Sequence, residues 1–168
     1  LRDNVRFHDG KPLTADDVVF TYDYFRTGPG KAAAGLVSLD VIAKVSAPNN
    51  RTVVFELTDP YAPFLIIVAG RTPILPKHIW SSVTDPAKFR DKKALIGSGP
   101  YTADVIDDAK QTYRYEANPD FFLGMPYVGA LEFTPTRDSL QSFDNGDLDV
   151  ADVSFEEGIP ASVLAKYK

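Results

Sequence analysis

The chain has 168 residues, with 18 Lys and Arg against 23 Asp and Glu, a formal net charge of −5, and no Cys. This length accommodates one ordinary domain or two small ones, and 44% hydrophobic residues can build a core, so a wholly disordered chain is excluded. Because the chain has no Cys, a disulfide scaffold and Cys-based metal or nucleophile sites are excluded. No apolar run reaches the roughly 18 residues that would span a bilayer. The acidic balance argues against nucleic acid as the main partner.

The first predicted element is a short strand near the N-terminus. Val5 and Phe7 alternate with polar residues, which is typical of a strand with one buried face. Asp9 and Gly10 predict a tight turn after it, because Asp bonds the backbone ahead of it and Gly tolerates a positive φ. We therefore expect the strand to end at this turn.

A helix is predicted over Ala15–Arg26. Thr14 is a suitable N-cap, and Asp16 and Asp17 place negative charge on the first turn, where the helix dipole favours it. Apolar residues then recur at helical spacing until Gly28-Pro29-Gly30 ends the run. The aromatic residues within this helix are interpreted as core residues and not as a ligand cage.

The middle of the chain predicts a β-hairpin. Val41, Ala43 and Val45 alternate with their neighbours, as do the apolar residues of 53–57, and Pro48-Asn49-Asn50 supplies a turn between the two runs. The alternation predicts that these apolar residues share the buried face of the hairpin.

A short buried helix is predicted after the hairpin. Asp59-Pro60 is typical of a helix start, and residues 64–68 are apolar on most sides, so we expect this helix to lie in the interior. The two prolines of 71–76 predict a rigid connector, and 77–81 are expected to form a further helical turn.

The second half predicts strands and short helices. The expected elements are a helix over 85–89, a tight loop at 97–100, strands over 101–106, 113–117, 128–135 and 148–153, and helices over 138–143 and 161–167. The fold class is therefore mixed α and β (α+β), with short β-sheets, hairpins and flanking helices and without a regular βαβ series.

No motif in the sequence supports catalysis or metal binding. His8 and His78 are interpreted as structural, because no nucleophile motif accompanies either of them. The acidic run Asp144–Asp149 fails the calcium-loop template, since Phe143 falls on a ligand position, and a helix C-cap at Gly146 followed by an exposed strand explains the run. We predict no catalytic residue, no metal site and no cofactor.

Three tyrosines are less constrained by the pattern. Tyr61, Tyr101 and Tyr127 lie outside the predicted helical core, so a role in stacking on a ligand stays open for them.

The order of several motifs resembles one protein family. These motifs are, in chain order, Leu1–Phe20, Thr52–Phe55, Pro63–Leu65, Ile74–Trp80, Gly97–Tyr101, Asn118–Phe122 and Gly146–Asp149. In this order the series closely resembles the family 5 extracellular (periplasmic) solute-binding proteins, the oligopeptide-, dipeptide- and nickel-binding receptors of bacterial ABC importers. The resemblance covers nearly the whole chain.

The resemblance implies a fragment of a two-lobe fold similar to the type II periplasmic binding proteins. Members of the family are considerably longer, so we expect the chain to lack both ends and the second lobe. By the same resemblance, residues 1–80 correspond to the small extra subdomain of the first lobe and residues 81–168 to part of that lobe's sheet.

The family resemblance also suggests where a ligand binds. The segment Ala34, Gly35 and Leu36 and the loop that holds Ser98 are the candidate ligand-binding residues, and the family commonly has Thr or Ser at the position of Ser98. A local bond to the backbone that holds the loop is the alternative role for the Ser98 hydroxyl.

The implied function is that of a substrate-binding component of an ABC importer, which captures a peptide or another small solute and delivers it to the permease subunits. The implied location is periplasmic or extracellular, with membrane contact only through the permease or a lipid anchor outside the chain, and no enzymatic activity is expected. Two alternatives are a solute-sensing domain of a cytoplasmic transcriptional regulator and, more remotely, a secreted carbohydrate-active hydrolase with paired acids.

Overall fold

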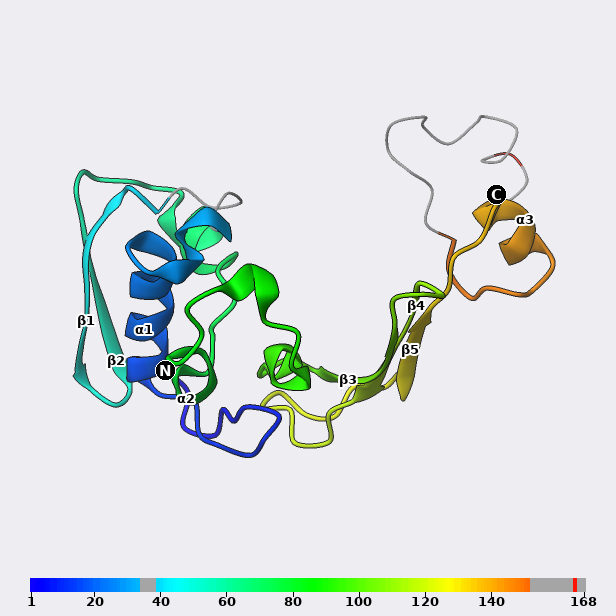
Figure 1. Ribbon diagram of the computed structural model, residues 1–168, viewed down its shortest axis with the longest axis horizontal. Coiled ribbons are helices and arrows are strands. Elements are labelled where there is room, and N and C mark those ends of the chain that lie inside the picture. The colour runs from blue at the N-terminus through cyan, green and yellow to red at the C-terminus, as the bar shows by residue number, and fades with distance from the viewer. Residues whose placement is uncertain (34–38, 152–164, 166–168) are drawn as a thin grey trace. The chain divides into compact units, whose positions relative to one another are not determined.

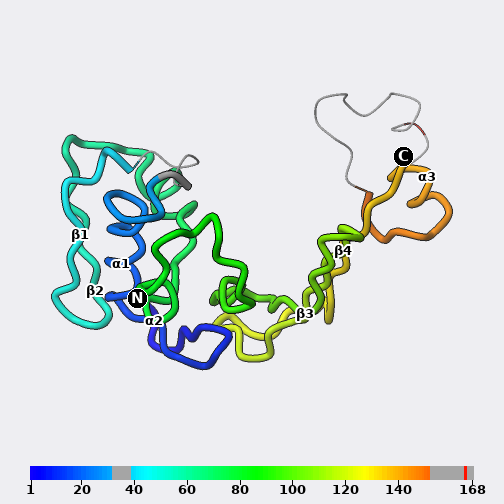
Figure 2. Tube along the Cα trace, in the orientation of Figure 1, coloured from blue at the N-terminus to red at the C-terminus, as the bar shows by residue number. Residues whose placement is uncertain are grey.

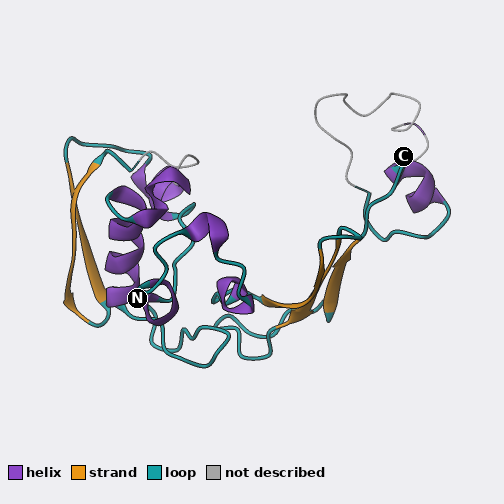
Figure 3. Ribbon diagram, in the orientation of Figure 1, coloured by secondary structure: helices purple, strands orange, loops and turns teal. Residues whose placement is uncertain are grey.

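The structure is a computed structural model that describes residues 1–33, 39–151 and 165. It divides into two compact units: residues 1–104 with 114–131, and residues 105–113 with 132–168. Figure 1 traces the chain through the helices and strands of these units. Short helices and strands occur in separate groups along the chain, as Figure 3 shows, which agrees with the expected α+β class.

The N-terminal segment forms a tight hairpin-like turn and not a regular strand. An isolated bridge joins Arg6 to Pro12, and the Phe7 N–H donates to the carbonyl of Lys11 at 2.8 Å. Gly10 has a φ of 82°, as the turn prediction required, because a side chain is strained in that conformation. The predicted strand therefore shrinks to a single bridge, since the turn begins directly after Phe7.

Helix α1 (Ala15–Arg26) has the predicted bounds, and the Asp17 carboxylate explains its start. Asp17 Oδ2 accepts from both the backbone N–H and the hydroxyl of Thr14, each at 2.9 Å. The carboxylate thus reaches back to the N-cap N–H, as the third residue of a capping box does. A 3₁₀ turn, η1 (Pro29–Ala33), follows after the glycines that end α1.

The hairpin consists of β1 (Ile42–Asn49) and β2 (Thr52–Leu57), which pair antiparallel beside α1 (Figures 1 and 2). In β2 the predicted alternation is confirmed. In β1 it is wrong: Ile42 and Val45 are buried while Ala43 is exposed, because the register shifts between Ile42 and Lys44. An irregularity of this kind lets two residues of one strand face one of its partner and so breaks the period of two.

The core lies between α1, the hairpin and the segment that follows it. Its buried members are Val18, Tyr22, Leu39, Ile42, Val45 and Val68. Tyr22 also stacks edge-on against Phe55 of β2 at a centroid distance of 4.9 Å. The interpretation of the helix aromatics as core is thus confirmed for Tyr22 and for Tyr24, which is 5% exposed.

The apolar run after the hairpin forms η2 (Phe64–Ala69), a single wide turn with π-helical hydrogen bonding. The prediction that this helix is buried is wrong, because only Val68 is buried while Leu65 and Ile66 are 74% and 75% exposed. The helix also begins at Phe64 after Pro63 and not at Pro60. An apolar run of this length cannot show from sequence which of its sides meets the core.

The rest of the first unit contains three short helices: α2 (Lys77–Trp80), η3 (Pro86–Lys88) and η4 (Lys92–Leu95). The expected turns at 77–81 and 85–89 are confirmed in shortened form. The sheet then follows as β3 (Tyr101–Asp107), β4 (Thr112–Ala117) and β5 (Ala130–Phe133), in the order β3-β4-β5.

Helix α3 (Ser139–Asp144) belongs to the second unit and ends as expected at a glycine C-cap. The Gly146 N–H donates to Phe143 O at 3.0 Å, and the φ of Gly146 is 80°. The strand expected over 148–153 is wrong where the structure describes it, because residues 148–151 pair with no other strand and bend at 149–150. The helix predicted over 161–167 lies outside the described residues except for Ala165.

Within the described residues, no helix has both the length and the apolar character needed to cross a bilayer.

Candidate functional site

The loop Gly97–Pro100 is the part of the predicted site that the structure describes. It connects the end of η4 to the start of β3, and Ser98 is half-buried within it. The segment Ala34, Gly35 and Leu36 lies outside the described residues, so its proposed role stays a prediction. Ser98 and its loop are therefore the part of the predicted site with a described geometry.

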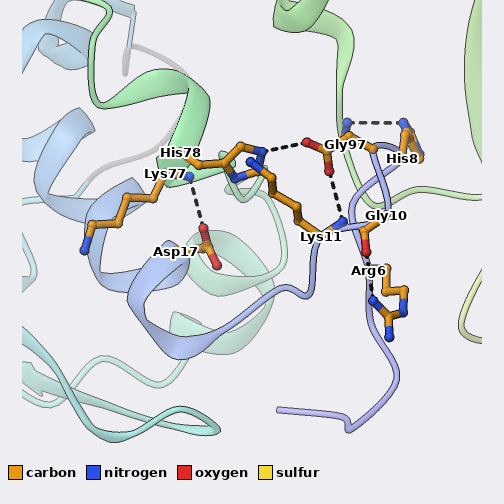
Figure 4. Close-up of polar contacts among 9 residues, drawn as sticks. Arg6, His8, Gly10, Lys11, Asp17, Lys77, His78 and Gly97 are labelled. Atoms are coloured by element: carbon orange, nitrogen blue, oxygen red, sulfur yellow. Dashed lines mark hydrogen bonds and ion pairs between the residues drawn. The ribbon is translucent and has the colours of Figure 1, made fainter.

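The side chain of His8 holds the beginning of this loop. Its Nδ1 accepts from the Gly97 N–H at 3.2 Å, and its Nε2 lies 3.1 Å from the Gly99 carbonyl oxygen. The His8 backbone N–H also donates to the Gly97 carbonyl at 2.8 Å. Figure 4 shows the His8 ring beside Gly97, and the positive φ of Gly10 turns the chain directly after it.

Asn118 holds the other end of the loop from the turn that follows β4. Its side-chain amide donates to the Gly99 carbonyl at 3.1 Å, and its backbone N–H donates to the Pro100 carbonyl at 2.8 Å. Its Oδ1 accepts from the Asp120 N–H at 3.0 Å, and only 9% of the residue is exposed. The loop is thus fixed by two side chains from distant parts of the sequence.

Within the described residues, no hydrogen-bond partner is found for the Ser98 hydroxyl. The alternative role of the Ser98 hydroxyl, a local backbone bond that holds the loop, is not seen in the described residues. Bonds from His8 and Asn118 hold the loop instead. These bonds agree with the interpretation of His8 as structural, and they reach glycines 89 and 91 residues away in the sequence.

A second polar contact joins the same turn to α2. His78 Nε2 lies 2.6 Å from Asp9 Oδ2, and Asp9 Oδ1 accepts from the Lys11 N–H at 3.2 Å (Figure 4). Desolvation acts to raise the pKa of Asp9, but the hydrogen bonds from His78 and Lys11 outweigh it and lower that pKa below its usual 3.8. The pair joins Asp9 to α2, while in the described part of the chain the contacts of this turn with the Ser98 loop come from His8 alone.

The buried Asp17 connects α1 to the start of α2. Its Oδ1 accepts from the Lys77 N–H at 3.0 Å, and Thr21 Oγ1 accepts from the Leu75 N–H at 2.9 Å. These two bonds attach the 75–77 segment, which His78 follows in the sequence, to α1. Figure 4 shows the Asp17 and His78 contacts in one view.

Tyr24 belongs to the core and also borders a surface groove. Burial, with a smaller effect of the Asp85 charge, raises the pKa of Tyr24, and its hydroxyl donates to the Val83 carbonyl. The groove has a volume of about 410 Å³, is lined by α1 and by residues of the 77–84 segment, and shares no residue with the Ser98 loop. Its carboxylates, Asp16 and Asp23, are each paired with a neighbouring cation.

The tyrosines left open for ligand stacking differ in their surroundings. Tyr61 packs against the core, while the Tyr101 hydroxyl donates to the Val128 carbonyl at 3.1 Å. Tyr127 is fully exposed. In the described residues no group of three or more His, Cys, Asp or Glu is placed to hold a metal ion.

Comparison with known proteins finds a match over the whole chain. A family model described as bacterial extracellular solute-binding proteins, family 5 Middle, matches residues 1–168. The oligopeptide-binding protein AppA of Bacillus subtilis (strain 168) is 33% identical over 159 residues, which cover 92% of this chain and 28% of AppA.

Solved structures of such proteins share the fold. AppA of Bacillus subtilis in complex with a nonapeptide matches with a TM-score of 0.74 and 30% identity, over 88% of this chain and 30% of AppA. The ABC transporter substrate-binding protein CtaP of Listeria monocytogenes matches with a TM-score of 0.72 and 34% identity, over 88% and 31%. NikZ of Campylobacter jejuni in complex with Ni(L-His) matches with a TM-score of 0.73 and 25% identity, over 89% and 30%.

The chain spans less than a third of the length of these relatives. The comparisons confirm the expected α+β fold of a type II-like periplasmic binding protein and the resemblance carried by the motif series.

Proposed function

Because this chain belongs to the bacterial extracellular solute-binding proteins of family 5, we propose that it forms part of the substrate-binding component of an ABC importer. The observation that carries the proposal is the match to AppA in both sequence and structure, over about nine-tenths of the chain. In its protein, the chain contributes to the capture of a solute that is then delivered to permease subunits in the membrane. The family is one of binding proteins, and we expect no catalytic turnover.

The proposed ligand class is a peptide. AppA of Bacillus subtilis was solved with a nonapeptide, and CtaP, which is 34% identical to this chain, is an ABC transporter substrate-binding protein. NikZ, with Ni(L-His), is less similar at 25% identity. A peptide offers carbonyl and carboxylate oxygens, which hydroxyl and backbone N–H donors recognise.

Within this chain, we place ligand contact at the Ser98 loop and at Ala34, Gly35 and Leu36. The geometry supports Ser98, because the loop is held rigidly by other residues while the Ser98 hydroxyl has no partner in the described part of the chain. A donor that is fixed in place loses little conformational entropy when it binds. The division into a subdomain at 1–80 and a sheet region at 81–168 belongs to the same proposal.

The family implies a periplasmic or extracellular protein. We propose that any membrane attachment comes from the permease or from a lipid anchor outside this chain.

Titration calorimetry on the complete protein tests this function. A nonapeptide, a tripeptide and the Ni²⁺–histidine complex serve as probes, and we expect the peptides to bind. The Ser98→Ala substitution should weaken peptide binding about tenfold, as expected for one lost hydrogen bond of about 1.4 kcal/mol, with an unchanged melting temperature. Tight binding of the nickel complex with no response to any peptide would contradict the peptide assignment.

A further inference from the structure

We propose that His8 is a positioning residue for the ligand site: its imidazole holds the Ser98 loop so that the loop's free donors face a bound solute's carbonyl or carboxylate oxygen. This inference rests on the proposed function and adds a residue that does not itself touch the ligand. The experiment below distinguishes a failure of the His8 role from a failure of the proposed function.

Both nitrogens of the His8 imidazole ring form hydrogen bonds with the backbone of the loop. Nδ1 accepts from the Gly97 N–H at 3.2 Å, which leaves the ring hydrogen on Nε2, and Nε2 then donates to the Gly99 carbonyl at 3.1 Å. The neutral ring thus spans Ser98, with one bond to the residue before it and one to the residue after it. No other side chain found in the described part of the chain bonds to both glycines.

The polar groups of the loop divide into those with a hydrogen-bond partner and those without one. The carbonyls of Gly97, Gly99 and Pro100 and the N–H of Gly97 are all bonded to His8 or Asn118. Within the described residues, the Ser98 hydroxyl and the N–H groups of Ser98 and Gly99 have no partner. The loop therefore keeps three neighbouring donors, and its acceptors are largely used internally.

The two glycines that flank Ser98 differ in the space beside them. A Cβ built on Gly97 lies 3.6 Å from Cε1 of His8, whereas a Cβ built on Gly99 meets nothing within 4 Å. The His8 ring therefore fills the space beside Gly97, while the space beside Gly99 is open. Three donors next to open space suit an acceptor group such as a carboxylate or a peptide carbonyl.

The experiment separates the two bonds of the ring by substitution in the complete protein. His8→Asn keeps an acceptor near the position of Nδ1, and His8→Gln keeps a donor near the position of Nε2, while His8→Ala removes both. His78→Ala serves as the matched control, because it removes a neighbouring histidine that contacts Asp9 and not the loop.

Hydrogen exchange of the Gly97 amide, measured without ligand, reads the loop directly. We expect exchange to be about tenfold faster in His8→Ala, near wild type in His8→Asn and unchanged in His78→Ala. Nonapeptide affinity should fall about tenfold in His8→Ala and recover in part in His8→Asn. Melting temperatures should stay close to those of His78→Ala.

Unchanged Gly97 exchange in His8→Ala would overturn the inference, as would faster exchange with unchanged nonapeptide affinity. If His8→Ala does not fold, the contrast between His8→Asn and His8→Gln decides, because only the Asn variant should keep Gly97 protected. A wild-type protein that binds none of the peptides would overturn the proposed peptide class, while Gly97 exchange would still report whether His8 holds the loop.

Discussion

Replacement of Asp17 by Ala is the sharpest test of how the first unit is held together. Asp17 is 6% exposed, and its carboxylate accepts three hydrogen bonds: two from Thr14 and one from the Lys77 N–H. Asp17→Ala leaves all three donors without their acceptor. Two of them belong to the start of α1, and the third belongs to the start of α2.

The expected cost follows from these bonds. Loss of an N-cap interaction costs about 1 kcal/mol, and a hydrogen bond to a charged group contributes about 1.5–3 kcal/mol. We therefore expect Asp17→Ala to lower the free energy of unfolding by about 3 kcal/mol. Asp17→Asn keeps the shape and one acceptor oxygen, so about half that loss is expected.

Asp16 supplies the matched control on the neighbouring position of the same helical turn. Its side chain is 66% exposed and makes only a 3.7 Å ion pair with Lys77, so Asp16→Ala should cost less than about 1 kcal/mol. Urea unfolding of the complete protein gives the free energies, and hydrogen exchange of the Lys77 amide gives the local effect. Equal costs for the two substitutions, with unchanged Lys77 exchange, would refute the reasoning.

Three further predictions concern single contacts. Thr21→Val should lower the free energy of unfolding by about 1–3 kcal/mol, because the hydroxyl of the fully buried Thr21 no longer accepts from the Leu75 N–H. Thr21→Ser should keep most of this stability in the same urea titration. Val68→Ala should lower the free energy of unfolding by about 2 kcal/mol, because Val68 is fully buried, whereas Ile66→Ala should lower it by less than about 0.5 kcal/mol, because Ile66 is 75% exposed. Similar melting temperatures for the two variants would contradict this prediction. The lowered pKa of Asp9 means that its carboxylate stabilises the fold above pH 3.8 and that this contribution is lost as the pH falls through the lowered value. The gap in melting temperature between wild type and Asp9→Asn should therefore be present at pH 7 and narrow as the pH is lowered below 3.8.

The elements that the sequence predicted well are those with local causes. Helix α1 has its cap, its acidic first turn and its terminating glycines within one stretch of chain, and its bounds were predicted correctly. The turns at Gly10 and Gly146 have the positive φ that their glycines suggested. Such features depend on residues a few positions apart, so the sequence displays their causes directly.

The elements that were predicted wrongly depend on contacts between distant segments. The exposure of Leu65 and Ile66 is decided by which side of η2 meets α1 and the hairpin, and the alternation in β1 fails because of a register shift against β2. Neither partner can be identified from the apolar pattern of the segment itself.

The candidate site shows the same limit. Ser98 was found through the family resemblance, but the residues that hold its loop, His8 and Asn118, lie in other parts of the sequence. The only sequence signals for them are the polar turns in which they occur. A residue that acts through a backbone contact 89 positions away carries no periodic pattern of its own.

The contact between Asp17 and Lys77 also constrains the order in which the chain folds. It joins residues 60 positions apart, and closing a loop of that length costs roughly 3–4 kcal/mol of chain entropy. One hydrogen bond of about 1.5–3 kcal/mol cannot repay that cost alone. The docking of 75–77 must therefore follow the collapse of α1 onto the hairpin. The part of the Asp17 effect that comes from the Lys77 contact should appear in the unfolding rate, whereas the part that comes from Thr14 acts on α1 itself.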